Sequence, residues 1–226
     1  MKWFIVLSSL LIFWNGINAA STGRVPTSAG TTGINSQVAT ALAEQAALEY
    51  KVSISLQQGS TEFAAQGLTG IADYLQSDSK TSLKRADAIV DYFRSRGASL
   101  PLTNVSVPDL SPIDTSSPAA AAAWAAKMES ATTQKLSQIA SLARQSNDEP
   151  TANFVAGMLE TQTQNEAEAT RVSNRLSYAG AERAAIMSVD AELSTKYAAN
   201  ARPLKGPSGN STAPRTPIGG PPLIDY

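Results

Sequence analysis

The sequence predicts an all-α protein: a bundle of four long helices with a long crossover between the second and the third, followed by a short fifth helix. Apolar residues recur at steps of three and four through four long segments, which is the period of an amphipathic helix. Stretches that contain Gly or Pro separate these segments. The proline-containing stretch after the second segment is too long for a tight turn. It therefore predicts a crossover that lets the second and third helices run parallel.

The N-terminus has the pattern of a secretory signal peptide. Lys2 supplies a positive charge, an apolar run extends from Trp3 to Trp14, and small residues around Ala20 suit cleavage. The apolar run is about a dozen residues long, whereas a membrane-spanning helix needs roughly 20. We therefore expect a signal peptide at residues 1–20, a flexible segment at 21–35, and a secreted or lumenal mature chain with no membrane span.

The composition excludes several classes of function. The chain has 18 basic and 19 acidic residues, a net charge of −1, so nucleic acid is not an expected partner. It has no cysteine, so stability must come from burial or assembly rather than from disulfides. It also has no histidine, which excludes His-activated nucleophiles and leaves only oxygen ligands for a metal ion.

The first two helices are predicted from their apolar stripes. The first covers residues 36–58, with Glu49 and Leu56 on the same face as the apolar residues. We expect Gly59-Ser60-Thr61 to end this helix and to cap the next one. The second stripe continues to Phe93, after which Arg96-Gly97 supplies the basic last turn and the glycine that typically end a helix.

The remaining elements follow in order. Residues 98–118 contain four prolines and form the crossover, and Pro118 suits the first turn of the third helix. The third, fourth and fifth helices are expected at 118–146, 149–178 and 181–200, so the bundle covers 36–200. Residues 201–226 are rich in Pro and Gly and predict a disordered tail. Asn104 and Asn210 begin N-glycosylation motifs, candidates in a secreted chain.

Over residues 36–200 the chain resembles a ferritin subunit. The similarity lies in the order and spacing of short motifs along the chain: Ala72 and Tyr74, Arg85-Ala86-Asp87, Arg96-Gly97, Val105 with Pro108-Asp109, Asn147-Asp148, Leu159-Glu160-Thr161-Gln162, and Leu176 with Gly180. The resemblance implies a ferritin-like four-helix bundle, and it also implies where an iron site would lie, since ferritins that oxidise iron hold two ions inside the bundle.

Three positions resemble the iron ligands of the family and three depart from them. Glu49, Glu129 and Gln162 resemble the glutamate of the first helix, the glutamate of the third and the glutamine of the fourth. Ser82 and Arg85 stand where the family has its bridging glutamate and its histidine, and Leu56 stands where a tyrosine is expected. Because Arg does not deprotonate in proteins, two ferrous ions should not bind beside it.

We therefore hypothesise that Arg85 occupies the former iron site and pairs with Glu49 and Glu129, because buried carboxylates need compensation. In the alternative, both glutamates lie at the boundary of the stripe and are solvated, as helical charges commonly are. Gln162 has a similar alternative, since its helix is rich in Gln and Thr. Under the first hypothesis Glu49, Glu129 and Gln162 are vestigial metal ligands. Arg85 and the two glutamates then form a structural ion pair in place of the metal.

The resemblance implies a secreted subunit of the structural, light-chain type, without ferroxidase activity. Such a chain would join other ferritin subunits, its own copies or active partners, in a shell for iron storage or transport, and any iron would be held by the assembled shell. Lys80 and Lys84 lie on the second helix where the family gathers iron, and would repel it. The alternative is a secreted protein on the same fold that no longer handles iron and has a structural or binding role. A third, weaker possibility is an oxygen-ligand metal enzyme that uses Glu49, Glu129 and Gln162.

Overall fold

The structure is a computed structural model that describes residues 33–100 and 110–201 of the chain. These residues form five α-helices and no strand, so the predicted all-α class with a fifth helix is confirmed. Their bounds are Ser36–Ala65 for α1, Thr69–Ser95 for α2, Pro118–Gln145 for α3, Glu149–Ala179 for α4 and Arg183–Ala201 for α5. None of them is both long and apolar enough to cross a membrane.

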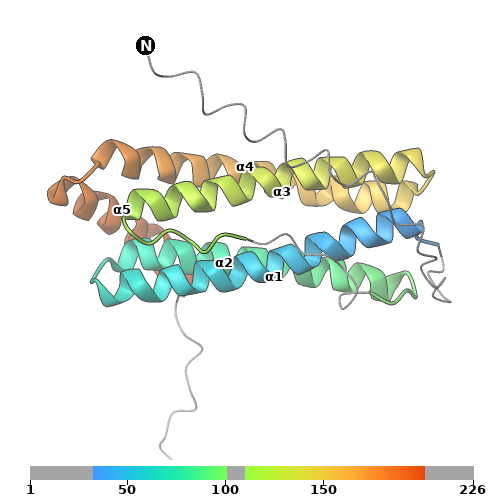
Figure 1. Cartoon of the computed structure of the whole chain (residues 1–226), viewed down its shortest axis with the longest axis horizontal. Helices are drawn as coiled ribbons and strands as arrows, with labels where there is room; N and C mark the ends of the chain where they lie inside the picture. Colours follow the sequence, from blue (N-terminus) through green and yellow to red (C-terminus); the bar gives the residue numbers. More distant parts are fainter. Residues whose placement is uncertain (1–32, 101–109, 202–226) are drawn as a thin grey trace, which may run out of the picture.

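The bundle is built from two helix pairs (Figure 1). Helix α1 packs along α2, α3 packs along α4, and contacts between α1 and α3 join the two pairs. The colour ramp in Figure 1 shows that α2 and α3 run in the same direction, whereas α4 runs opposite to α2. This is the arrangement that a long crossover after the second helix permits.

Helix α1 is longer than the sequence predicted, and the expected break at Gly59 is wrong. Gly59 is buried within α1 because Ile113 of the crossover lies over it, and a Cβ added there would be 2.8 Å from the Ile113 Cδ1 atom. Ser60 does not cap the next helix, since its hydroxyl donates to the carbonyl of Ala72 across the α1–α2 interface at 2.8 Å. The chain turns instead after Gln66, at Gly67, whose φ of 80° favours glycine.

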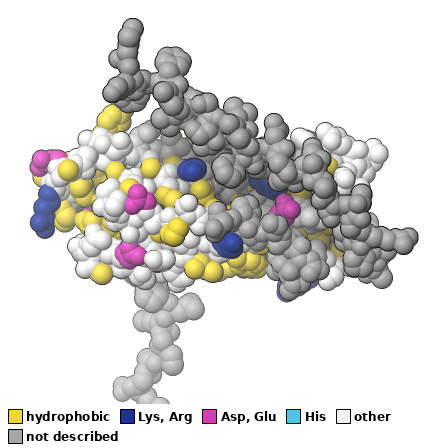
Figure 2. Space-filling view, in the orientation of Figure 1, with side chains coloured by type: hydrophobic (Ala, Val, Ile, Leu, Met, Phe, Trp, Pro, Cys, Tyr) yellow, Lys and Arg dark blue, Asp and Glu magenta, His cyan; other side chains and the backbone are white. Residues whose placement is uncertain are grey.

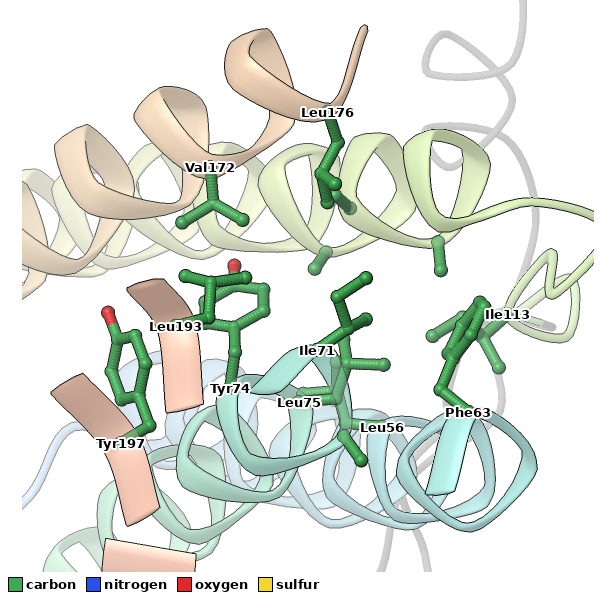
Figure 3. Close-up of a cluster of buried hydrophobic side chains, with 14 of the residues drawn as sticks. Leu56, Phe63, Ile71, Tyr74, Leu75, Ile113, Val172, Leu176, Leu193 and Tyr197 are labelled. Carbon is green, nitrogen blue, oxygen red and sulfur yellow. The ribbon is translucent and has the colours of Figure 1, made fainter. Parts of the chain in front are cut away.

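The apolar core is divided into two clusters by a polar layer. The cluster at the end nearer α5 includes Leu56, Phe63, Tyr74 and Val172, and is shown in Figure 3. The opposite cluster includes Leu42, Phe93, Leu136 and Val155, with residues from α1 to α4. Between the two clusters lie buried polar side chains, which are Gln45, Glu49, Ser82, Arg85, Glu129, Thr132 and Gln162.

Helix α5 is fastened to the start of α2. The Asp190 side chain accepts a hydrogen bond from the Ile71 backbone N–H at 2.8 Å, so it caps a helix to which it is not joined in sequence. The two backbones approach so closely at Gly70 that an added Cβ would be 1.8 Å from the Asp190 carbonyl oxygen. Leu193 and Tyr197 of α5 complete the apolar cluster beside Tyr74 (Figure 3).

Several sequence predictions concern residues outside the described ranges. These are the signal peptide at 1–20, most of the flexible segment at 21–35, the tail beyond residue 201, and the glycosylation candidates Asn104 and Asn210. They stay predictions.

Substitution of two glycines that lie inside helices should change the free energy of unfolding in opposite directions. Gly70→Ala should lower the free energy of unfolding by about 1–3 kcal/mol, because the new methyl group collides with the α5 backbone. Gly157→Ala in α4 should raise it by about 0.5–1 kcal/mol, because nothing lies within 4 Å of the added Cβ and alanine favours helix. Urea unfolding of the two variants measures both values. Equal effects of the two substitutions would contradict the docking of α5 described above.

Candidate functional site: an ion pair at the bundle centre

Arg85 of α2 lies between two glutamates from different helices. Its Nε donates to Glu49 Oε1 of α1 at 3.0 Å, and Nη1 and Nη2 donate to Glu129 Oε2 and Oε1 of α3 at 3.2 and 2.9 Å. The bond to Glu129 is therefore bidentate, the strongest geometry for a guanidinium and a carboxylate. The side chains of Glu49 and Glu129 are each 1% exposed and that of Arg85 is 9% exposed. We call Glu49, Arg85 and Glu129 the central triad.

Neutral polar residues hold the triad in place. Ser82 Oγ accepts from Arg85 Nη2 at 2.9 Å, and Gln45 Nε2 donates to Glu49 Oε1 at 2.8 Å. Gln162 of α4 donates through Nε2 to the side chain and the backbone carbonyl of Glu129, at 2.6 and 3.0 Å. All four helices of the bundle thus contribute to one buried hydrogen-bond network.

The structure brings Glu49, Arg85, Glu129, Ser82 and Gln162 together, and none of them is solvated at the edge of a stripe. The alternative of solvated glutamates, and that of an unengaged Gln162, are therefore wrong. Leu56 lies apart from this network, fully buried in the apolar cluster nearer α5.

The charges of the triad act on the pKa values of Arg85 and Glu49. Burial alone would lower the pKa of Arg85, but the two carboxylates outweigh it and raise the pKa above its ordinary value. Burial raises the pKa of Glu49, although Arg85 and the hydrogen bond from Gln45 act in the opposite direction. The network has more buried carboxyl groups than buried cations, so a proton is favoured somewhere within it.

A further carboxyl group, that of Asp78 of α2, lies beside Glu129 and was not predicted from the sequence. Burial raises the pKa of Asp78 well above its ordinary range, and the charge of Glu129 and a hydrogen bond with it act in the same direction. Burial of Asp78 thus favours its protonated form. Its position could have identified it, because it precedes Ser82 by four residues and Arg85 by seven, which places all three on one helix face.

The residues of this centre do not fit a pair of iron ions. The space between the two glutamates is taken by a permanent cation that makes four hydrogen bonds to its neighbours. Within the described ranges, no group of three or more Asp, Glu, His or Cys side chains is placed so that it could hold a metal ion.

The fold and this centre define a class of protein, a four-helix bundle with a carboxylate-bearing core of the kind that metal-handling bundles have. The sequence matches the family model of the ferritin-like domain over residues 39–178. This is more than half of the chain, which therefore belongs to the ferritin family.

Solved structures support the same fold. The protein is similar to an open-pore ferritin from the hyperthermophilic archaeon Archaeoglobus fulgidus, with a TM-score of 0.65, 23% identity, and coverage of 72% of this chain and 98% of that chain. An engineered closed form of the A. fulgidus ferritin gives a TM-score of 0.64 with 24% identity, covering 71% and 96% of the two chains. A humanized archaeal ferritin gives 0.63 with the same identity and coverage. A comparison with curated protein sequences finds no match.

Removal of the central cation should be strongly destabilising. Arg85→Met leaves Glu49 and Glu129 buried without a partner, so the free energy of unfolding should fall by about 3–5 kcal/mol. The triple variant Arg85→Met, Glu49→Gln, Glu129→Gln removes all three charges and should recover most of that loss. Thermal and urea unfolding of both variants measure this. If Arg85→Met were as stable as the native chain, the two glutamates would need no cation.

The raised pKa of Asp78 predicts that the stability of the protein falls as pH rises. At pH values between the unfolded and the folded pKa of this group, the folded chain holds a proton that the unfolded chain has lost, so stability falls as pH rises. Asp78→Asn removes this titration and retains the hydrogen-bonding shape. The variant's advantage in unfolding free energy should therefore grow by about 1.4 kcal/mol per pH unit through that window. Urea unfolding at a series of pH values above the ordinary pKa of an Asp side chain tests it, and a difference independent of pH would contradict the raised pKa of Asp78.

Proposed function

We propose that this chain is a secreted ferritin subunit of the structural, light-chain type, which contributes to a shell without oxidising iron itself. The observation that supports this most directly is the guanidinium of Arg85 between Glu49 and Glu129 at 3.0 and 2.9 Å. A cation at this place takes over the role of a metal in neutralising the glutamates. The bundle is then held together without iron.

Secretion is supported by the N-terminal pattern, with its positive residue, short apolar run and small residues before the cleavage point.

Assembly is supported by apolar side chains that the single chain leaves exposed. Ile54 on α1 is 68% exposed and Tyr178 at the end of α4 is 91% exposed. Met187 on α5 lies close in sequence to Tyr178 and is also exposed. On the face shown in Figure 2, charges of both signs are scattered singly among apolar side chains, a surface without a strong field to oppose contact between copies.

A second candidate function, on the same fold but without iron, is supported by the charges on α2. Lys84 is exposed and Lys80 is partly exposed on this helix, and two cations oppose the gathering of ferric ions there. Under this reading the chain would have a structural or binding role. Any iron in the first case would be held by the assembled shell and not by the bundle centre.

Light scattering of the purified protein, followed by metal analysis of the same peak, separates the two candidates. A cage-sized particle that holds iron, alone or mixed with an oxidising ferritin subunit, supports the light-chain role. A monomer or dimer without iron supports the second candidate.

The lack of oxidase activity has its own test. The native chain should oxidise ferrous iron no faster than buffer does. The triple variant Ser82→Glu, Arg85→His, Leu56→Tyr restores the residue types of the family at all three departures and should oxidise it measurably faster, provided that circular dichroism shows it folded. Oxidation by the native chain that survives Glu49→Gln and Glu129→Gln would place the activity elsewhere; oxidation abolished by those substitutions would overturn the proposed absence of a ferroxidase centre.

A further inference from the structure

Helix α5 is attached to its two neighbours in different ways. Towards α2 it buries apolar side chains, with Leu193 and Tyr197 beside Tyr74 (Figure 3), and Asp190 accepts the hydrogen bond from the Ile71 N–H. Towards α4, the side-chain hydrogen bonds and ion pairs of its described residues all involve a charged group. Because α5 has only 19 residues, and short helices are marginal without tertiary packing, its position depends on both attachments.

The attachment to α4 consists of paired charges. Lys196 Nζ of α5 lies 2.7 Å from Glu168 Oε1 of α4, and Arg171 Nη1 of α4 lies 3.5 Å from Glu192 Oε1 of α5. Arg175 of α4 also pairs with Glu192. Each helix thus places both signs of charge opposite their complements on the other helix. We call these five residues the α4–α5 latch.

The latch is sensitive to salt. Its side chains are between 27% and 47% exposed, and partly exposed ion pairs are weakened when dissolved ions screen them. Glu168 keeps its charge near neutral pH, because hydrogen bonds from Arg171, Lys196 and Tyr197 lower its pKa to about 2 against the effect of burial. Ionic strength is therefore the variable that loosens the latch under these conditions.

The connection between α4 and α5 has the properties of a hinge. It consists of residues 180–182, and Gly180 has a φ of 57° and a ψ of −128°, a conformation that favours glycine. A Cβ added at Gly180 would meet nothing within 4 Å, so no neighbour packs closely against this residue. Hinges are a few residues at element ends that absorb changes in φ and ψ. Rotation at Gly180 can therefore move α5 without distorting α4.

A small polar cavity lies beneath α5. It has a volume of about 80 Å³, and its walls include Tyr74 and Asp78 of α2 and Tyr197 of α5. The Tyr74 hydroxyl and the Asp78 Oδ2 atom are buried with no hydrogen-bond partner among the described residues. Asp78 in turn lies beside Glu129 of the central triad. Because Tyr197 covers the cavity from α5, displacement of this helix would expose the cavity to solvent.

We propose that α5 is a hinged lid, which turns at Gly180, is held closed by the α4–α5 latch, and controls solvent access to the cavity beside the central triad. A short helix that carries few of the core contacts is the kind of unit that opens locally while the rest of a protein stays folded. The proposal is independent of iron and of shell formation, because the hinge, the latch and the cavity all belong to one chain.

Hydrogen exchange of the full-length protein, followed by mass spectrometry, measures opening of the lid. Between about 0.02 M and about 0.5 M NaCl the Debye length falls from roughly 20 Å to roughly 4 Å. The amides of α5 should exchange about two- to tenfold faster at the higher concentration, the effect expected when a few partly exposed ion pairs are lost. The central amides of α1 to α4 should keep their rates.

A second measurement shows what the lid covers. Tetranitromethane nitrates accessible tyrosines, and mass spectrometry identifies the modified residue. Nitration of Tyr74, which is 3% exposed, should increase with salt by about the same factor as exchange in α5. Tyr178, which is 91% exposed, should be nitrated equally at both salt concentrations and serves as the internal control.

Three variants separate the latch from general stability. Glu192→Lys places a further cation beside Arg171 and Arg175, and salt screens the resulting repulsion, so the increase of α5 exchange with salt should vanish or reverse. The matched control Glu160→Lys, at an exposed glutamate of α4, should keep the native salt dependence. Gly70→Ala pushes the α5 backbone away from α2 and should increase both α5 exchange and Tyr74 nitration at every salt concentration.

Three outcomes would overturn the proposal. The first is α5 amides that are as protected as the centre of α4 at both salt concentrations. The second is an equally steep salt dependence in Glu192→Lys and Glu160→Lys, and the third is faster exchange in α5 without nitration of Tyr74. Circular dichroism shows whether each variant is folded. Should Glu192→Lys fail to fold, Lys196→Gln replaces it, with faster α5 exchange at low salt and a weaker salt dependence as the expected result.

Discussion

The structure depends on the need of two buried carboxylates for a cation. Glu49 and Glu129 project from α1 and α3 into the centre of the bundle, where an unpaired charge would cost several kcal/mol. Arg85 meets that need from α2, and Gln162 joins α4 to the same network. The apolar core on either side of this network consists of two separate clusters. The triad therefore fixes the register of the four helices as well as their charge balance.

Much of the fold could be predicted from local patterns, because apolar periodicity and helix ends act over a few residues. The helix ends at Ser95 and Gln145 lie within one residue of the predicted bounds. The failure at Gly59 shows the limit of such patterns. A glycine inside a helical pattern can be there for packing rather than to end the helix. Gly59 is such a case, because the side chain of Ile113, distant in sequence, lies where a Cβ would be. The cap that Asp190 gives to α2 was beyond sequence reasoning for the same reason.

The candidate site, like the fold, could be predicted from the sequence only in part. The positions of Glu49, Arg85 and Glu129 on predicted apolar faces, together with the ferritin resemblance, were enough to bring them together in a hypothesis. Asp78 was missed because an aspartate on a helix is ordinarily solvated, whereas here its Oδ2 atom is buried without a hydrogen-bond partner among the described residues. Tyr74 lies one turn away with its hydroxyl equally unpaired. Such groups are visible only when the neighbouring helices are in place.

Exchange of a metal for a guanidinium changes what the bundle can respond to. A metal centre stabilises its protein only when the ion is bound, whereas a covalently attached cation is present in every molecule at every pH at which the protein folds. The stability of this bundle is thereby separated from the supply of iron.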